Sequence, residues 1–154
     1  MITENKLKKF FINLMISEGQ AIGIYEAELF LNLSPKDIFQ KILLDEISHE
    51  KELIGIIDEM NWSLSVYQIL LLKLHRLLGW SIGILMSIIP KRLCFLFHQS
   101  GEMKAAKDYD ELKSFIDQHY NSTLFPSIQI KAKLEKIIEN EKLHSDTFRG
   151  LLAK

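Results

Sequence analysis

The sequence predicts an all-α protein with four long helices in two pairs and an apolar helical segment between the pairs. Three observations predict this fold. Apolar residues recur at intervals of three and four over most of the chain, which is the spacing of one helix face. The 154 residues include only three prolines and seven glycines, which leaves room for long helices. Glutamate and histidine recur at helical spacing in corresponding places of the two halves.

The first helix pair is expected over residues 3–61. Its first helix covers about residues 3–31, and Glu18 lies on the same face as the apolar side chains. A carboxylate among core residues is costly unless it is paired, protonated or bound to a cation. Glu18 is therefore a candidate ligand, whereas Glu26 and Glu28 are expected in solvent.

A turn is predicted at Asn32-Leu33-Ser34-Pro35. Ser34 is the expected N-cap of the next helix and Pro35 its first helical residue, because serine caps helices and proline fixes φ at a helical value. This second helix is expected to continue to about Met60.

Residues 64–90 are the most apolar part of the chain. They include only Lys73, His75 and Arg76 as ionisable groups, and residues 77–89 are 13 in a row without a charge. That run is too short to span a membrane, which takes about 20 residues. Two interpretations remain: a buried helix packed against the bundle, or a helix that lies in the membrane interface.

Two details of this apolar segment bear on those interpretations. The interfacial one assigns Trp62, Tyr67 and Trp80 to the boundary between lipid and water, and it assigns the basic residues to lipid headgroups: Lys73, Arg76, Lys91 and Arg92. Gly79 and Gly83 are four residues apart and permit another helix to approach closely.

The second helix pair is expected over residues 91–152, after Pro90 ends the apolar segment. Its first helix runs to about His119, a turn follows at residues 120–123, and its second helix begins at about Leu124.

Length and composition limit the class of protein. A chain of this length is expected to form one domain, residues 1–154. The net charge of −1 gives no electrostatic reason to expect nucleic-acid binding. The single Cys94 excludes an internal disulfide framework and is expected to be buried. No secretory signal is recognised, so a cytoplasmic location is expected.

The second helix of each pair contains a Glu-x-x-His motif. The two copies are Glu46 with His49 and Glu141 with His144. Side chains three apart lie on one face of a helix about one turn from each other, so each motif can offer two ligands to one metal ion. His75, His98 and His119 have no glutamate three residues before them and are expected at helix surfaces or interfaces rather than as ligands.

The first helix of each pair contains a matching motif, E-x-x-A-x-x-x-Y. The two copies are Glu18, Ala21 and Tyr25, and Glu102, Ala105 and Tyr109. They precede their Glu-x-x-His motifs by 28 and 39 residues. Four helices with six such ligands are the ligand set of ferritin-like di-iron and di-manganese bundles. The oxygen and nitrogen donors suit iron or manganese.

These motifs, with Gly79-Trp80-Ser81-Ile82-Gly83 between them and Ser145-Asp146 after the second histidine, occur in the order and approximate spacing of a known family. The chain resembles the demethoxyubiquinone hydroxylases of ubiquinone biosynthesis over about residues 14–148. It departs from their usual pattern at residues 14–17, where Leu-Met-Ile-Ser replaces Asp-His-Ala-Gly, and at Asp108, where they have histidine.

The resemblance implies a di-iron monooxygenase that hydroxylates a membrane-borne polyprenyl quinone or quinol precursor with O₂ and electrons from NADH. The implied ligands of the two iron ions, which manganese could replace, are Glu18, Glu46, His49, Glu102, Glu141 and His144. Tyr109 matches a tyrosine linked to substrate or electron transfer. The apolar segment would bind the inner face of the cell membrane. A homo-oligomer or a lipid-binding accessory protein is a further expected partner.

Two other functions fit the same motifs. One is a different ferritin-like oxidase, a ferroxidase or an iron-binding protein, which would oxidise iron without lipid. The other is a helical interaction module without metal, in which the motifs form a buried polar network.

Overall fold

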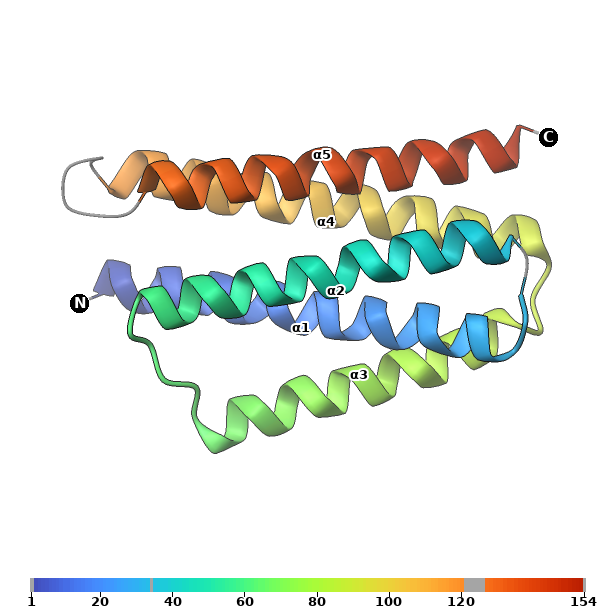
Figure 1. Ribbon diagram of the computed structural model, residues 1–154, viewed down its shortest axis with the longest axis horizontal. Coiled ribbons are helices and arrows are strands. Elements are labelled where there is room, and N and C mark those ends of the chain that lie inside the picture. Colours follow the sequence, from blue (N-terminus) through green and yellow to red (C-terminus); the bar gives the residue numbers. More distant parts are fainter. Residues whose placement is uncertain (1, 34, 121–126, 154) are drawn as a thin grey trace. The chain divides into compact units, whose positions relative to one another are not determined.

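The chain is all-α in the computed structural model, which describes residues 2–33, 35–120 and 127–153 (Figure 1). The helices within these residues are α1 (Ile2–Phe30), α2 (Lys36–Glu59), α3 (Val66–Met86), α4 (Lys91–His119) and α5 (Ser127–Leu152). The described residues contain no strand, and the helices pack as in a bundle, so the all-α expectation is confirmed. Contacts divide the chain into two compact units, Met1–Leu14 with Arg92–Lys154, and Met15–Lys91.

The unit of residues 15–91 contains the second part of α1 together with α2 and α3. The α1–α2 contact includes the rings of Tyr25 and Phe39, whose centroids are 5.9 Å apart. The buried apolar side chains of this unit are Met15, Ile22, Ile24, Tyr25, Ala27, Phe39, Ile42, Leu53, Ile56 and Ile57.

The start of α2 differs from the sequence prediction. Pro35 is the N-cap, and Lys36 is the first helical residue. The reason is the backbone of Pro35, whose ψ of 113° is extended, as an N-cap requires, even though its φ of −89° is not far from the helical range. Ser34, the expected N-cap, lies outside the described residues.

Glycines bring α3 against α1. A Cβ at Gly79 would lie 2.1 Å from the carbonyl oxygen of Gln20, and a Cβ at Gly83 would lie 2.5 Å from that of Ile24. On α1, a Cβ at Gly23 would lie 2.2 Å from the carbonyl oxygen of Arg76. The two backbones are therefore in direct contact, and the close approach predicted from Gly79 and Gly83 is confirmed.

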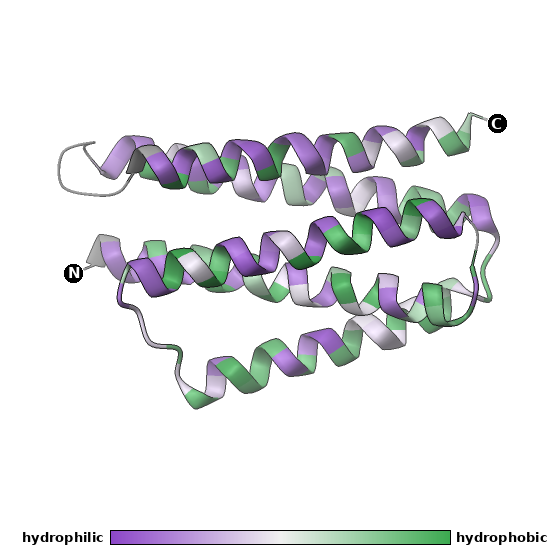
Figure 2. Ribbon diagram, viewed as in Figure 1, coloured by the Kyte–Doolittle hydropathy of each residue, from purple (hydrophilic) through white to green (hydrophobic). Residues whose placement is uncertain are grey.

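The opposite side of α3 is apolar and exposed. Gly79 and Gly83 are the buried residues of this helix, and Figure 2 shows it mostly in the hydrophobic colour. The α3 stripe, as we name the exposed apolar residues on the side away from the glycines, comprises Val66, Tyr67, Leu70, Leu74, Leu77, Ile84 and Leu85. The interpretation of this segment as a buried helix is therefore wrong for this face. By length and composition α3 can cross a membrane.

The unit of residues 1–14 and 92–154 contains the first part of α1 together with α4 and α5. α4 and α5 are antiparallel, as two ion pairs show: Lys113 Nζ lies 2.8 Å from Glu135 Oε1, and Lys131 pairs with Asp117 (Figure 1). The buried apolar residues from α4 and α5 are Cys94, Ala106, Tyr109, Leu112, Phe115, Ile116, Ile130, Leu134, Ile137, Ile138 and Phe148. The expected burial of Cys94 is thus confirmed.

The three non-motif histidines differ in their surroundings. His98 is buried, and its ring stacks on Phe148 of α5 with centroids 4.7 Å apart, so its expected place at a helix interface is confirmed. Its neighbours explain this, because the aromatic ring supplies an apolar partner for the imidazole. His75 Nδ1 lies 3.2 Å from Gln20 Oε1, and the exposed His119 stacks on Phe115.

Candidate metal centre

The unit of residues 15–91 buries one glutamate from α1 and a Glu-x-x-His pair from α2. Glu18, Glu46 and His49 are each only 2% exposed. One ligand atom from each lies within 4.8 Å of the others. His49 Nδ1 is 3.8 Å from Glu18 Oε2, so the imidazole faces the carboxylate of the neighbouring helix. We name these three residues the first triad.

The other unit repeats this arrangement on α4 and α5. Glu102, Glu141 and His144 are buried, and one ligand atom from each lies within 4.8 Å of the others. His144 Nδ1 is 3.5 Å from Glu102 Oε2. We name these residues the second triad. The same nitrogen faces the same kind of carboxylate in both units, as the internal repeat of the sequence predicts.

The geometry of each triad fits a metal ion. Bonds of about 2.1 Å from an ion to nitrogen or oxygen place two ligands about 3 Å apart at right angles and about 4 Å apart on opposite sides. The measured separations of 3.5 and 3.8 Å lie between these limits. Both exceed the usual N–H···O hydrogen-bond range of about 2.7–3.2 Å. The triads contain carboxylates and imidazole without a thiolate, a donor set that suits iron or manganese.

Burial adds an energetic reason for a cation. Two carboxylates in each triad are removed from water, and an uncompensated buried charge costs several kcal/mol. A divalent ion would offset both charges of one triad. The class of protein defined by the fold and these clusters is therefore an all-helical protein with buried carboxylate–histidine groups that can hold metal.

The tyrosines of the two motifs are also buried. Tyr25 is 1% exposed and Tyr109 is 0% exposed. Each follows its motif glutamate by seven residues, which is two helical turns and therefore the same face. Tyr109 is thus placed on the ligand-bearing side of α4.

An ion-pair network next to the first triad had no recognisable signal in the sequence. Arg76 of α3 reaches α1 and α2: its Nη2 lies 2.5 Å from Glu26 Oε1, and its Nη1 lies 3.9 Å from Glu50 Oε2. Burial raises the pKa of Glu50, Arg76 opposes this shift, and Glu18 and Glu26 add to it. The hydrogen bond that Arg76 donates to Glu26 raises the pKa of Arg76. Arg76 thus places a positive charge among carboxylates beside the triad.

Glu28 corrects a second expectation about α1. It was expected in solvent, yet it is fully buried, whereas Glu26 is partly exposed. The sequence pattern assumes one buried face, but this part of α1 packs against both α2 and α3. A helix with two neighbours buries more of its circumference than one apolar stripe indicates.

Comparisons with family models, with curated proteins and with solved structures find no match to this chain.

Proposed function

We propose that the protein is a di-iron monooxygenase that hydroxylates a membrane-borne quinone or quinol precursor of the demethoxyubiquinone type. One observation carries the proposal: two buried triads, each with two carboxylates and one imidazole on corresponding helices. In this proposal each triad would supply two carboxylates and one imidazole to the metal centre. The four carboxylates would balance the charge of two divalent ions.

The reaction consumes one molecule of O₂. A ring C–H becomes C–OH, the second oxygen atom leaves as water, and two electrons and two protons are taken up, with NADH as the ultimate electron donor. The ions would supply the redox chemistry, and the residues of the two triads would bind and orient them. His49 and His144 present Nδ1 to the site in the structure, so the neutral imidazole with its proton on Nε2 is the required tautomer.

The lipid substrate and the membrane surface are assigned to α3. Exposed apolar side chains cover one side of this helix, while Arg76 and the glycines hold its other side on α1 and α2. A helix with such a stripe lies in the interface of a bilayer. A spanning orientation is disfavoured, because the helix contains Lys73 and Arg76. The protein is accordingly assigned to the inner face of the cell membrane.

Turnover with a lipid quinol tests the proposal. Protein loaded anaerobically with iron is mixed with a demethoxyquinol analogue in detergent, a chemical reductant and O₂, and the product is followed by mass spectrometry. We expect a product one oxygen atom heavier from the wild type and none from Glu141→Ala. Iron-loaded protein that oxidises only Fe²⁺ and leaves the quinol unchanged would contradict the hydroxylase and support a ferroxidase.

The two motif tyrosines give a matched pair for the same assay. Tyr109→Phe removes the hydroxyl assigned to substrate or electron transfer, and Tyr25→Phe removes its counterpart in the other repeat. We expect Tyr109→Phe to lower turnover at least tenfold with its iron content unchanged, and Tyr25→Phe to lower it much less. Equal effects of the two variants would remove the special role of Tyr109.

A further inference from the structure

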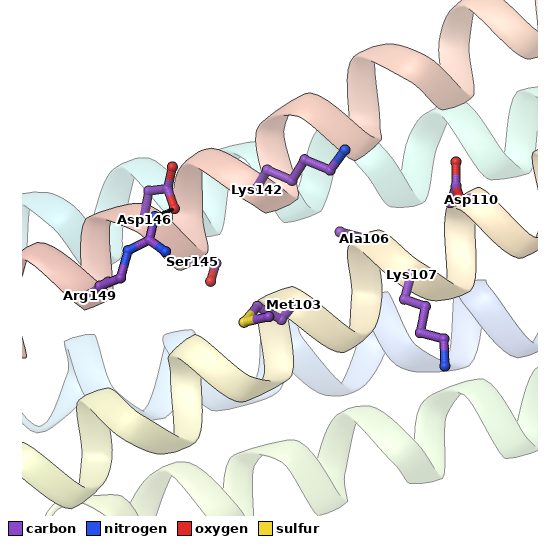
Figure 3. A pocket seen from close by; sticks show the side chains of 8 residues that line it. All are labelled: Met103, Ala106, Lys107, Asp110, Lys142, Ser145, Asp146 and Arg149. Carbon is purple, nitrogen blue, oxygen red and sulfur yellow. Dashed lines mark hydrogen bonds and ion pairs between the residues drawn. The ribbon is translucent and has the colours of Figure 1, made fainter.

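A pocket of about 340 Å³ opens in the groove between α4 and α5 (Figure 3). Its lining consists of Met103, Ala106, Lys107, Asp110, Lys142, Ser145, Asp146 and Arg149. Ala106 and Ser145 are buried and form the floor, while the other six side chains are exposed and form the rim. All eight belong to the same unit of the chain. We name this feature the α4–α5 pocket.

The floor of the α4–α5 pocket adjoins the second triad. Ala106 follows Glu102 by one helical turn, and Ser145 directly follows His144. The Ser145 hydroxyl donates a hydrogen bond of 3.4 Å to the carbonyl oxygen of Gln99 on the facing helix. Two of the smallest side chains of this helix pair therefore line the pocket within one helical turn of the ligands.

The first repeat has large side chains at the corresponding positions. Ile22 corresponds to Ala106, and Glu50 corresponds to Ser145. In that unit α3 also packs over the helix pair, with Arg76 reaching Glu26 and Glu50. Large side chains and α3 thus cover the first helix pair, whereas the pocket lies over Ala106 and Ser145 next to the second triad. The two repeats therefore have the same ligand residues, but different side chains and helices lie over them.

The size and charge of the pocket define what it can admit. Its volume is at the lower end of the range of about 300–1,000 Å³ for ligand pockets, which suits a small molecule rather than a polyprenyl chain. Arg149 forms an ion pair with Asp146 on the rim, and Lys107 Nζ lies 3.8 Å from Glu111 Oε1. The exposed Lys142 and Asp110 add opposite charges at the rim, and the lining as a whole has three basic and two acidic residues, which gives it a net charge of +1.

We propose that the α4–α5 pocket is the entrance through which small neutral or singly negative molecules, the size class of dioxygen and azide, reach metal at the second triad. Ala106 and Ser145 keep the side chains of the floor small, and Lys142 attracts anions. Since this role requires the metal centre proposed above, the experiment measures metal content and ligand entry separately.

Azide binding to protein loaded with Co²⁺ measures entry without turnover. The absorption of the metal reports azide in a stopped-flow experiment. Ala106→Leu fills the floor, and Ala105→Leu is its control at a half-buried neighbour outside the pocket. We expect Ala106→Leu to slow azide binding at least tenfold, with the Co²⁺ content of both variants equal to that of the wild type.

A surface variant keeps the experiment decisive if Ala106→Leu does not fold. Lys142→Glu reverses the charge at the rim, and Lys136→Glu makes the same change at another exposed position of α5. We expect Lys142→Glu to slow azide binding about threefold or more at low salt, with a smaller effect at high salt because exposed charges are screened. Lys136→Glu should have little effect.

The outcomes distinguish the two proposals. Full Co²⁺ content with unchanged azide rates in Ala106→Leu and Lys142→Glu would overturn the entrance and leave the metal centre intact. A wild type that binds no metal would overturn both. If Lys142→Glu and Lys136→Glu slow azide binding equally, the effect comes from the net charge of the protein, and the role of the pocket is overturned.

Discussion

At the scale of single residues, the protein buries charged side chains at positions where apolar side chains would cost less free energy. Each triad buries two carboxylates and one imidazole, and Glu50 with Arg76 lies beside the first triad. Replacing buried ion pairs by apolar residues is often neutral or stabilising, so such residues need a reason other than stability. The proposed metal binding would supply that reason.

Glu50 gives a prediction about pH. Burial raises the pKa of Glu50 above its ordinary value, so the folded protein holds a proton at pH values where the unfolded chain has released it. The free energy of unfolding should therefore fall as pH rises through this window. In Glu50→Gln the side chain at this position cannot titrate, so the free energy of unfolding should fall less as pH rises.

Urea unfolding of metal-free protein between about pH 4 and pH 7 measures this dependence. Glu139→Gln, at an exposed position of α5, serves as the control and should follow the wild type. Identical pH profiles for the wild type and Glu50→Gln would show that Glu50 is not the group responsible.

At the scale of elements, the contact between α1 and α3 depends on missing side chains. Gly23 and Gly79 each face a carbonyl oxygen of the other helix at a distance where no Cβ fits. Backbone atoms cannot turn aside as a flexible side chain can, so a methyl group there must push the helices apart. The position of α3, and with it that of Arg76, thus depends on these glycines.

Gly79→Ala should therefore lower the free energy of unfolding by about 1–3 kcal/mol, the usual cost of overpacking. Gly101→Ala is the matched control, because a Cβ at Gly101 of α4 would meet nothing within 4 Å. There the substitution should stabilise the helix by about 0.5–1 kcal/mol. Denaturant unfolding should therefore show a lower free energy of unfolding for Gly79→Ala and a higher one for Gly101→Ala. A change in the same direction for both variants would contradict the close contact between α1 and α3.

Much of this arrangement follows from sequence periodicity. The Glu-x-x-His motifs and single glutamates lie on the inner faces of their helices, because their spacing matches that of the apolar residues. The burial of Glu28 did not follow, because the apolar pattern of one helix does not show which of its other faces neighbouring helices cover. The α4–α5 pocket, likewise, depends on which side chains two helices bring together.

At the scale of the whole molecule, the most unusual surface is the exposed α3 stripe. Single exposed leucines are common in proteins, but here apolar residues continue along one side of a helix of 21 residues. Such a surface marks a binding site for lipid or for another protein. We assign it to lipid, and flotation with anionic phospholipid vesicles tests this assignment.

Leu70→Glu and Leu44→Glu form a matched pair, because these leucines are 63% and 62% exposed and lie on α3 and α2. We expect the wild type and Leu44→Glu to float with the vesicles and Leu70→Glu to bind about tenfold more weakly. Burying one leucine side chain contributes about 1.5–3 kcal/mol, which is tenfold or more in binding. Loss of an oligomer in Leu70→Glu, without a change in flotation, would assign the stripe to a second copy of the chain.

The central claim is that the two triads together hold two metal ions. The most direct test is the iron content of protein purified anaerobically, for the wild type, Glu141→Ala and Glu139→Ala, which removes an exposed carboxylate of the same helix. We predict two iron ions per chain in the wild type and Glu139→Ala, and a marked loss in Glu141→Ala. An intact helical protein without metal in all three would contradict the claim and make the triads a buried polar network.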